Sequence, residues 1–136
     1  LKGRLPTEAK IVGVARTEYS DAAFREHLGP KVKEVMTGSG ETWNESAWNE
    51  FAARVFYVPA DVTKPGGTEP LQKWFDVNEG KEGGRRLYYL SVAPHLYPEL
   101  GTLLGEANFH KEQGGFRRLI IEKPFGHDMA TAKALN

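Results

Sequence analysis

The sequence has no cysteine and no excess of charge of either sign among its 136 residues. The lack of cysteine excludes thiolate catalysis, disulfides and cysteine-ligated metals, and it fits a reducing cytoplasm. Lysine plus arginine and aspartate plus glutamate both number 18, so the formal net charge is zero. No overall field attracts nucleic acid or an anionic membrane, and we expect neither as a partner.

Long apolar runs are also lacking. No run approaches the roughly 20 residues that span a bilayer, and the first ten residues lack the apolar core of a signal sequence. We therefore expect a cytoplasmic protein. The chain begins with leucine and ends about two turns into the helical pattern DMATAKALN, and we interpret it as a piece of a longer protein.

Short apolar, β-branched runs alternate with helical patterns along the chain. The predicted strands are residues 10–15, 54–58, 86–92 and 117–122. The predicted helices begin after Ser20 or Asp21 and at residues 44, 70 and about 98, and the last extends to about residue 112. The dipeptide Gly29-Pro30 is expected to kink or end the first. Strands separated by helices imply right-handed crossovers, so we predict an α/β fold with a doubly wound, Rossmann-like and mostly parallel sheet.

Ligands of such sheets bind beyond the carboxyl ends of the strands. Arg16, Asp61, Ala93 with Pro94, and Lys123 follow the four predicted strands. These residues are therefore the candidate binding residues.

Arg16 follows the strand sequence KIVGVA. A strand end of this kind in an NAD-binding fold carries an acidic residue for the ribose hydroxyls, whereas an arginine suits the 2′-phosphate of NADP. Arg16 therefore favours NADP, and a solvated loop arginine is the alternative.

Lys123 stands between Glu122 and Pro124. The proline restricts the backbone on both sides of its peptide bond, so the ammonium is presented at the strand end with little freedom. It is suited to a phosphate or a sugar hydroxyl, and an ordinary solvated lysine is the alternative.

Three kinds of site have no support in the sequence. The four histidines are scattered without the spacing of metal ligands, and none is paired with a carboxylate as a general base. No predicted strand is followed by the glycine-rich turn that holds a dinucleotide pyrophosphate at a helix amino end. We therefore predict no metal site and no catalytic residue in this chain.

Three blocks, GVARTEYSDAAFREHL, RLYYLSVAP and RLIIEKPFGHD, resemble successive blocks of the coenzyme domain of glucose-6-phosphate dehydrogenases, above all bacterial ones. The resemblance covers essentially the whole chain, and EKPFG is its most specific part. It implies NADP as the coenzyme, with Arg16 on the 2′-phosphate. It also implies that Ala93, Pro94 and Tyr97 line the coenzyme site, and that Lys123 contacts glucose 6-phosphate beside the coenzyme.

The resemblance further implies oxidation of glucose 6-phosphate to a 6-phosphogluconolactone in the pentose phosphate pathway of glucose metabolism, by a homo-oligomeric enzyme. Family members begin with a strand and a G-A-S-G-D-L turn, expected just before Leu1, and continue into a large α+β domain that supplies the histidine base. Residues 1–136 are accordingly expected to be an incomplete NADP-binding domain. It would lack its first strand, its glycine-rich turn and the catalytic domain, and be inactive alone.

Two other interpretations stay open. One is another sugar or inositol dehydrogenase with Glu-Lys-Pro at a strand end, although Phe125, Gly126 and the VAP block argue against it. The other is a truncated, non-enzymatic nucleotide-binding module. The reading frames upstream and downstream of this sequence would decide between them.

Overall fold

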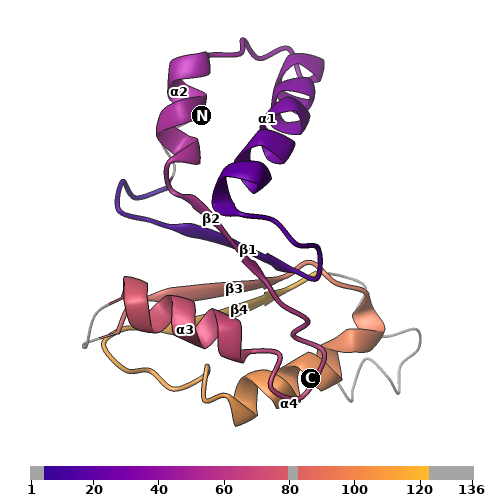
Figure 1. Cartoon of the computed structure of the whole chain (residues 1–136), viewed down its shortest axis with the longest axis vertical. Helices are drawn as coiled ribbons and strands as arrows, with labels where there is room; N and C mark the ends of the chain where they lie inside the picture. The colour runs from indigo at the N-terminus through magenta and orange to yellow at the C-terminus, as the bar shows by residue number, and fades with distance from the viewer. Residues whose placement is uncertain (1–4, 80–82, 123–136) are drawn as a thin grey trace. The chain divides into compact units, whose positions relative to one another are not determined.

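The computed structural model describes residues 5–79 and 83–122 (Figure 1). They belong to two compact units, Leu1–Ala60 and Asp61–Asn136. Each unit contains a pair of parallel strands with helices between them. This arrangement confirms the predicted α/β class with parallel pairing.

In the first unit, β1 (Ile11–Ala15) pairs in parallel with β2 (Val55–Pro59), and Ile11 lies opposite Val55. Parallel neighbours need a long crossover, which α1 (Asp21–Gly38) and α2 (Glu45–Ala52) provide. The buried side chains of this unit are Trp48, Ala52, Val55, Tyr57, Val58 and Ala60. Three of these six, Val55, Tyr57 and Val58, come from β2, so this strand contributes more buried side chains than any other element of the unit.

Helix α1 begins where the sequence predicts, because the Ser20 hydroxyl caps it by accepting a hydrogen bond from the Ala23 amide. It then runs through Pro30 to Gly38, so the helix does not end at Gly29-Pro30, which was one of the two outcomes expected there. Gly29 is buried against the indole of Trp48, and a Cβ at this glycine would lie 3.3 Å from the ring. Packing on α2 therefore holds the helix together at the point where proline weakens it.

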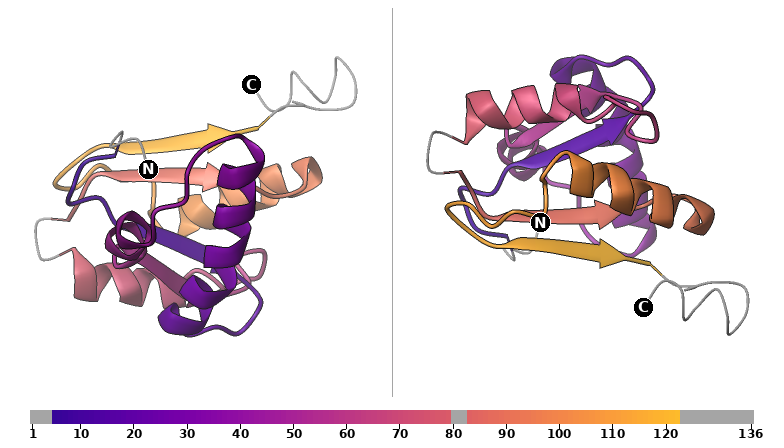
Figure 2. Two further views of the ribbon diagram at one scale, coloured as in Figure 1. Left: turned by 90° about the horizontal axis from the view of Figure 1, so that it is seen from above. Right: turned by 90° about the horizontal axis from the view of Figure 1, so that it is seen from below.

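In the second unit, β3 (Arg86–Leu90) pairs in parallel with β4 (Arg117–Ile121). Both views of Figure 2 show the two strands side by side with their arrows pointing the same way. The strands are joined by a short 3₁₀ turn, η1 (Pro94–Leu96), and by α4 (Tyr97–Glu106). Helix α3 (Glu69–Asn78) precedes β3.

Helix α4 ends earlier than the sequence pattern indicates, at Glu106 instead of about residue 112. Asn108 adopts a left-handed backbone with φ of 59°, a conformation that asparagine tolerates better than most residues. The Phe109 amide then donates to the Leu104 carbonyl, and the Phe109 side chain is fully buried. The helix ends because the chain turns to insert this ring into the core.

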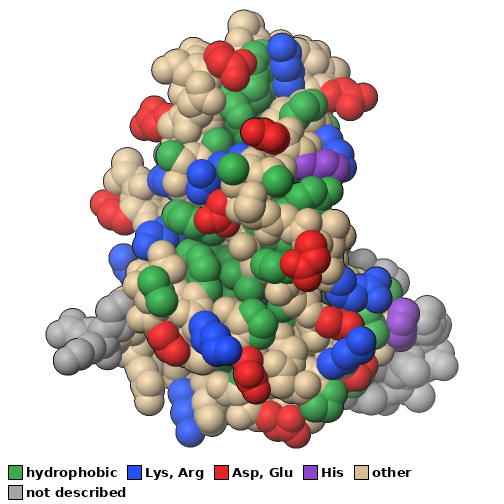
Figure 3. All heavy atoms as spheres, in the orientation of Figure 1, with side chains coloured by type: hydrophobic (Ala, Val, Ile, Leu, Met, Phe, Trp, Pro, Cys, Tyr) green, Lys and Arg blue, Asp and Glu red, His purple; other side chains and the backbone are tan. Residues whose placement is uncertain are grey.

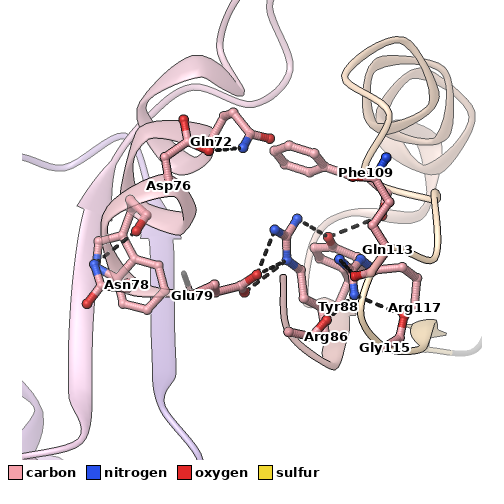
Figure 4. Close-up of polar contacts among 12 residues, drawn as sticks. Gln72, Asp76, Asn78, Glu79, Arg86, Tyr88, Phe109, Gln113, Gly115 and Arg117 are labelled. Carbon is pink, nitrogen blue, oxygen red and sulfur yellow. Dashed lines mark hydrogen bonds and ion pairs between the residues drawn. The ribbon is translucent and has the colours of Figure 1, made fainter. Parts of the chain in front are cut away.

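A part-buried ion pair joins Glu79, the residue that follows α3, to Arg86, the first residue of β3 (Figure 4). The Arg86 guanidinium donates to both carboxylate oxygens of Glu79 at 2.7–2.9 Å. Its central carbon lies 3.7 Å from the ring centroid of Phe75, which is itself buried. The arginine thus combines a paired charge with packing on an aromatic face.

Acidic and basic side chains are interspersed over the face shown in Figure 3, in keeping with the zero net charge. No helix within residues 5–79 and 83–122 is long and apolar enough to cross a membrane.

Candidate nucleotide-binding edge

Arg16 is the first residue after β1, the position at which the sequence predicts a coenzyme contact. Its side chain is exposed, and among the described residues its guanidinium has no ion-pair partner. The guanidinium is therefore available to an anionic ligand at the carboxyl end of the strand.

The Tyr57 side chain of β2 is hydrogen-bonded to the backbone on either side of Arg16. The Tyr57 hydroxyl lies 2.7 Å from the Thr17 carbonyl oxygen and 3.1 Å from that of Ala15. Burial raises the pKa of this tyrosine, with smaller contributions from Tyr19 and Glu18. The hydroxyl therefore keeps its proton and acts as a donor at neutral pH. Sequence reasoning missed Tyr57; its place in an apolar strand two residues before the strand end was the available signal.

Two side chains of α1 bond to the backbone of β2. The Asp21 carboxylate accepts a hydrogen bond from the Tyr57 amide at 2.7 Å, and Arg25 Nε donates to the Val55 carbonyl at 2.7 Å. Asp21 and Arg25 are one helical turn apart, and Val55 and Tyr57 are two residues apart on one edge of the strand. This pairing fixes the start of α1 against β2.

In the second unit, Ala93, Pro94 and Tyr97 follow β3 and form the start of η1 and α4. Ala93 is exposed and Pro94 half-buried, whereas Tyr97 is 4% exposed. The Tyr97 hydroxyl donates to the Glu122 carbonyl at 3.4 Å. Tyr97 therefore links α4 to the carboxyl end of β4.

A second tyrosine meets the same residue. The Tyr89 hydroxyl donates to the carboxylate of Glu122, and this hydrogen bond raises the pKa of Tyr89. The backbone and the side chain of Glu122 are thus both engaged by tyrosines of the β3–α4 segment.

The predicted site residues are only partly brought together. The structure places Ala93, Pro94 and Tyr97 in one short segment of the second unit, whereas Arg16 lies in the first unit. Lys123 lies outside the described residues, although the residue before it is bonded to Tyr89 and Tyr97.

Asp61 also follows a strand, but its carboxylate is engaged in a local turn. It accepts hydrogen bonds from the Thr63 hydroxyl at 2.6 Å and the Thr63 amide at 3.3 Å, and it pairs with Lys64 at 3.3 Å. The Thr63 hydroxyl is the main reason that the pKa of Asp61 is lowered. Within the ranges that the structure describes, no three acidic, histidine or cysteine side chains cluster as metal ligands.

The comparisons with known proteins agree with one another. The family description "Glucose-6-phosphate dehydrogenase, NAD binding domain" matches residues 1–136. Glucose-6-phosphate 1-dehydrogenase from Aggregatibacter actinomycetemcomitans is 34% identical over 135 residues, which are 98% of this chain and 26% of that protein. The Bacillus subtilis enzyme of the same name is 32% identical over 141 residues, again 98% and 26%. This chain therefore spans about a quarter of the length of these relatives.

Solved structures of other proteins superimpose on this chain. A glucose-6-phosphate dehydrogenase in complex with its substrate glucose-6-phosphate superimposes with a TM-score of 0.78 at 31% identity, covering 98% of this chain and 27% of that one. Glucose-6-phosphate 1-dehydrogenase from Mycobacterium avium gives a TM-score of 0.71 at 28% identity, with 94% and 25% coverage. Because the family description, which names a nicotinamide coenzyme, matches the whole chain, the chain belongs to the family of glucose-6-phosphate dehydrogenase NAD binding domains.

Proposed function

We propose that this chain is part of an enzyme that oxidises D-glucose 6-phosphate to a 6-phosphogluconolactone with NADP, in the pentose phosphate pathway. The observation that carries the proposal is the match of the whole chain to the coenzyme domain of this family. It is supported by the similar fold of a glucose-6-phosphate dehydrogenase in complex with its substrate glucose-6-phosphate.

The preference for NADP over NAD rests on Arg16. An exposed guanidinium without an ion-pair partner among the described residues, directly after a parallel strand, is suited to paired hydrogen bonds with a 2′-phosphate. NAD, which has a ribose hydroxyl there, would leave this charge without a partner. NADP, when bound, supplies the acceptor for the hydride that leaves C1 of the sugar.

The other site residues have distinct proposed roles. Ala93 and Pro94 offer small side chains at the end of β3, where the nicotinamide half of the coenzyme can approach the backbone. Tyr97 shapes the same place through its ring and its bond to the Glu122 carbonyl. Lys123, the next residue, binds glucose 6-phosphate beside the coenzyme, where an ammonium suits phosphate and hydroxyl oxygens.

Residues 1–136 then serve as an incomplete NADP-binding domain of a cytoplasmic homo-oligomer. The location follows a relative from Arabidopsis thaliana, 30% identical and named glucose-6-phosphate 1-dehydrogenase 6, cytoplasmic. The pyrophosphate-binding turn and the histidine that removes the C1 hydroxyl proton would come from other parts of the enzyme, because this sequence has neither in a suitable place.

The test is an activity assay on the full-length protein that carries this sequence. The absorbance of the reduced coenzyme is followed with glucose 6-phosphate, with glucose and with inositol, each with NADP and with NAD. We expect reduction of NADP that depends on glucose 6-phosphate. Turnover of inositol or free glucose in preference to the phosphate ester would favour the other dehydrogenase family, and no turnover with any substrate would favour a binding module.

A further inference from the structure

We propose that Tyr57 is a positioning residue that fixes the backbone around Arg16 and thereby increases the selectivity for a coenzyme with a 2′-phosphate. This inference rests on the proposed role of Arg16. It adds a buried residue whose hydroxyl lies within hydrogen-bond distance of the backbone on either side of Arg16.

The single Tyr57 hydroxyl is shared between two backbone carbonyl groups, one on each side of Arg16, and we call this pair of contacts the Tyr57 clamp. The Tyr57 hydroxyl reaches the carbonyl oxygens of Ala15 and Thr17, the residues directly before and after Arg16. Pairing with β2 ends at Ala15, whose carbonyl also accepts from the Ala60 amide at 2.9 Å. The Thr17 carbonyl lies beyond the sheet, so the shorter bond, at 2.7 Å, fixes the side of the arginine that the sheet does not hold.

The tyrosine that makes this clamp is itself held in place. It is 7% exposed, its ring centroid lies 4.6 Å from that of Phe24, and its amide donates to Asp21. Gly13 leaves the space for these rings, because a Cβ there would lie 3.0 Å from the Phe24 ring and 3.3 Å from the Tyr57 ring. Because the ring is packed in place, its hydroxyl holds the backbone around Arg16 in one position.

A preordered backbone favours binding because less conformational freedom is lost when the ligand arrives. Paired hydrogen bonds between a guanidinium and a phosphate also depend on direction, so they need the arginine to start from one position. NAD has no 2′-phosphate and gains nothing from that position. Removal of the Tyr57 hydroxyl should therefore affect NADP and leave NAD nearly unchanged.

The experiment compares Tyr57→Phe with Tyr19→Phe in the full-length protein. Tyr57→Phe keeps the ring and removes the hydroxyl that forms the clamp. Tyr19→Phe is the control, because it removes the hydroxyl of a neighbouring ring whose centroid lies 5.6 Å from that of Tyr57. We expect Tyr57→Phe to raise the KM for NADP about fivefold to tenfold, because the backbone around Arg16 would then have to be ordered when the coenzyme binds. The kcat and the KM for NAD should change by less than about twofold, and Tyr19→Phe should change neither coenzyme's KM.

A double-mutant cycle with Arg16→Ala separates this inference from the proposed function. If Arg16→Ala abolishes the preference for NADP and Tyr57→Phe has no further effect in that background, Tyr57 acts through Arg16. If Arg16→Ala abolishes the preference but Tyr57→Phe alone leaves it intact, the clamp is wrong and the role of Arg16 stands. Equal losses with NADP and NAD in Tyr57→Phe would also overturn the clamp, because they indicate general destabilisation. An unchanged preference in Arg16→Ala would remove both assignments.

Discussion

The central carbon of the Arg86 guanidinium lies over the ring of Phe75, 3.7 Å from the ring centroid, and the same guanidinium donates hydrogen bonds to the carboxylate of Glu79. The side chains of the ion pair are only 13% and 16% exposed. Removal of a planar, bidentate donor from such a place leaves a largely desolvated carboxylate with poorer partners.

Arg86→Lys should therefore lower the free energy of unfolding by about 2 kcal/mol, since lysine keeps the charge but loses the second hydrogen bond and the stacking. Urea denaturation measures the change. The control is Arg118→Lys, in the exposed pair with Glu112, whose side chains are 62% and 56% exposed. This control should have a much smaller effect, and equal losses in the two variants would mean that burial of the Arg86 pair contributes nothing.

The pKa of Asp61 should rise toward the ordinary carboxylate value of about 4 in Thr63→Val, because the Thr63 hydroxyl is the main cause of its lowering. A pKa that is lower in the folded state gives stability that is complete above the ordinary value and is lost as the pH falls through the folded value. The wild-type chain should thus lose more stability than Thr63→Val on acidification below about pH 4.

A carboxyl-detected NMR titration of Asp61 provides the measurement. Thr102→Val is the matched control, because it removes a threonine hydroxyl that bonds to the Pro98 carbonyl on α4. An Asp61 titration that is identical in Thr63→Val and the wild type would contradict the assignment.

Arg16→Asp in the full-length protein should raise the KM for NADP by about 100-fold or more, because two charge-assisted hydrogen bonds are replaced by repulsion between two anions. The KM for NAD should change by only about twofold to threefold. Arg118→Asp makes the same change in net charge at another exposed site and should affect neither coenzyme. Equal losses for NADP and NAD would remove the 2′-phosphate assignment.

Lys123→Ala should reduce turnover and raise the KM for glucose 6-phosphate together, with kcat/KM falling about tenfold to 100-fold for the loss of a hydrogen bond from a charged group. Steady-state kinetics with saturating NADP provide the measurement. Lys73→Ala replaces an exposed lysine on α3 and should behave as the wild type. An unchanged kcat/KM in Lys123→Ala would make this lysine an ordinary solvated residue.

A purified polypeptide of residues 1–136 should give no reduction of NADP with glucose 6-phosphate. None of its strands is followed by a glycine-rich turn for the pyrophosphate, and none of its histidines is placed as a general base in the sequence. The absorbance of NADPH, compared with a blank without enzyme, tests this expectation, and turnover above the blank would refute it.

The sequence by itself determined the alternation of strands and helices, since apolar runs and capping residues act locally. Ser20 starts α1 and Asn44 starts α2 through their own side chains. The residue types that follow the strands could also be read directly, which is why Arg16 is a candidate without any knowledge of its neighbours.

Contacts between distant residues were decided only by the tertiary structure. Continuation of α1 through Pro30 depends on Trp48 packing on Gly29, and the early end of α4 depends on burial of Phe109. The bonds from Tyr57 to Ala15 and Thr17 join residues at least 40 positions apart. Sequence spacing reports the period of a segment, but not which distant side chain will reach its carbonyl groups. Arg16 was therefore visible in the sequence, whereas the residue that holds it in place became visible only in the fold.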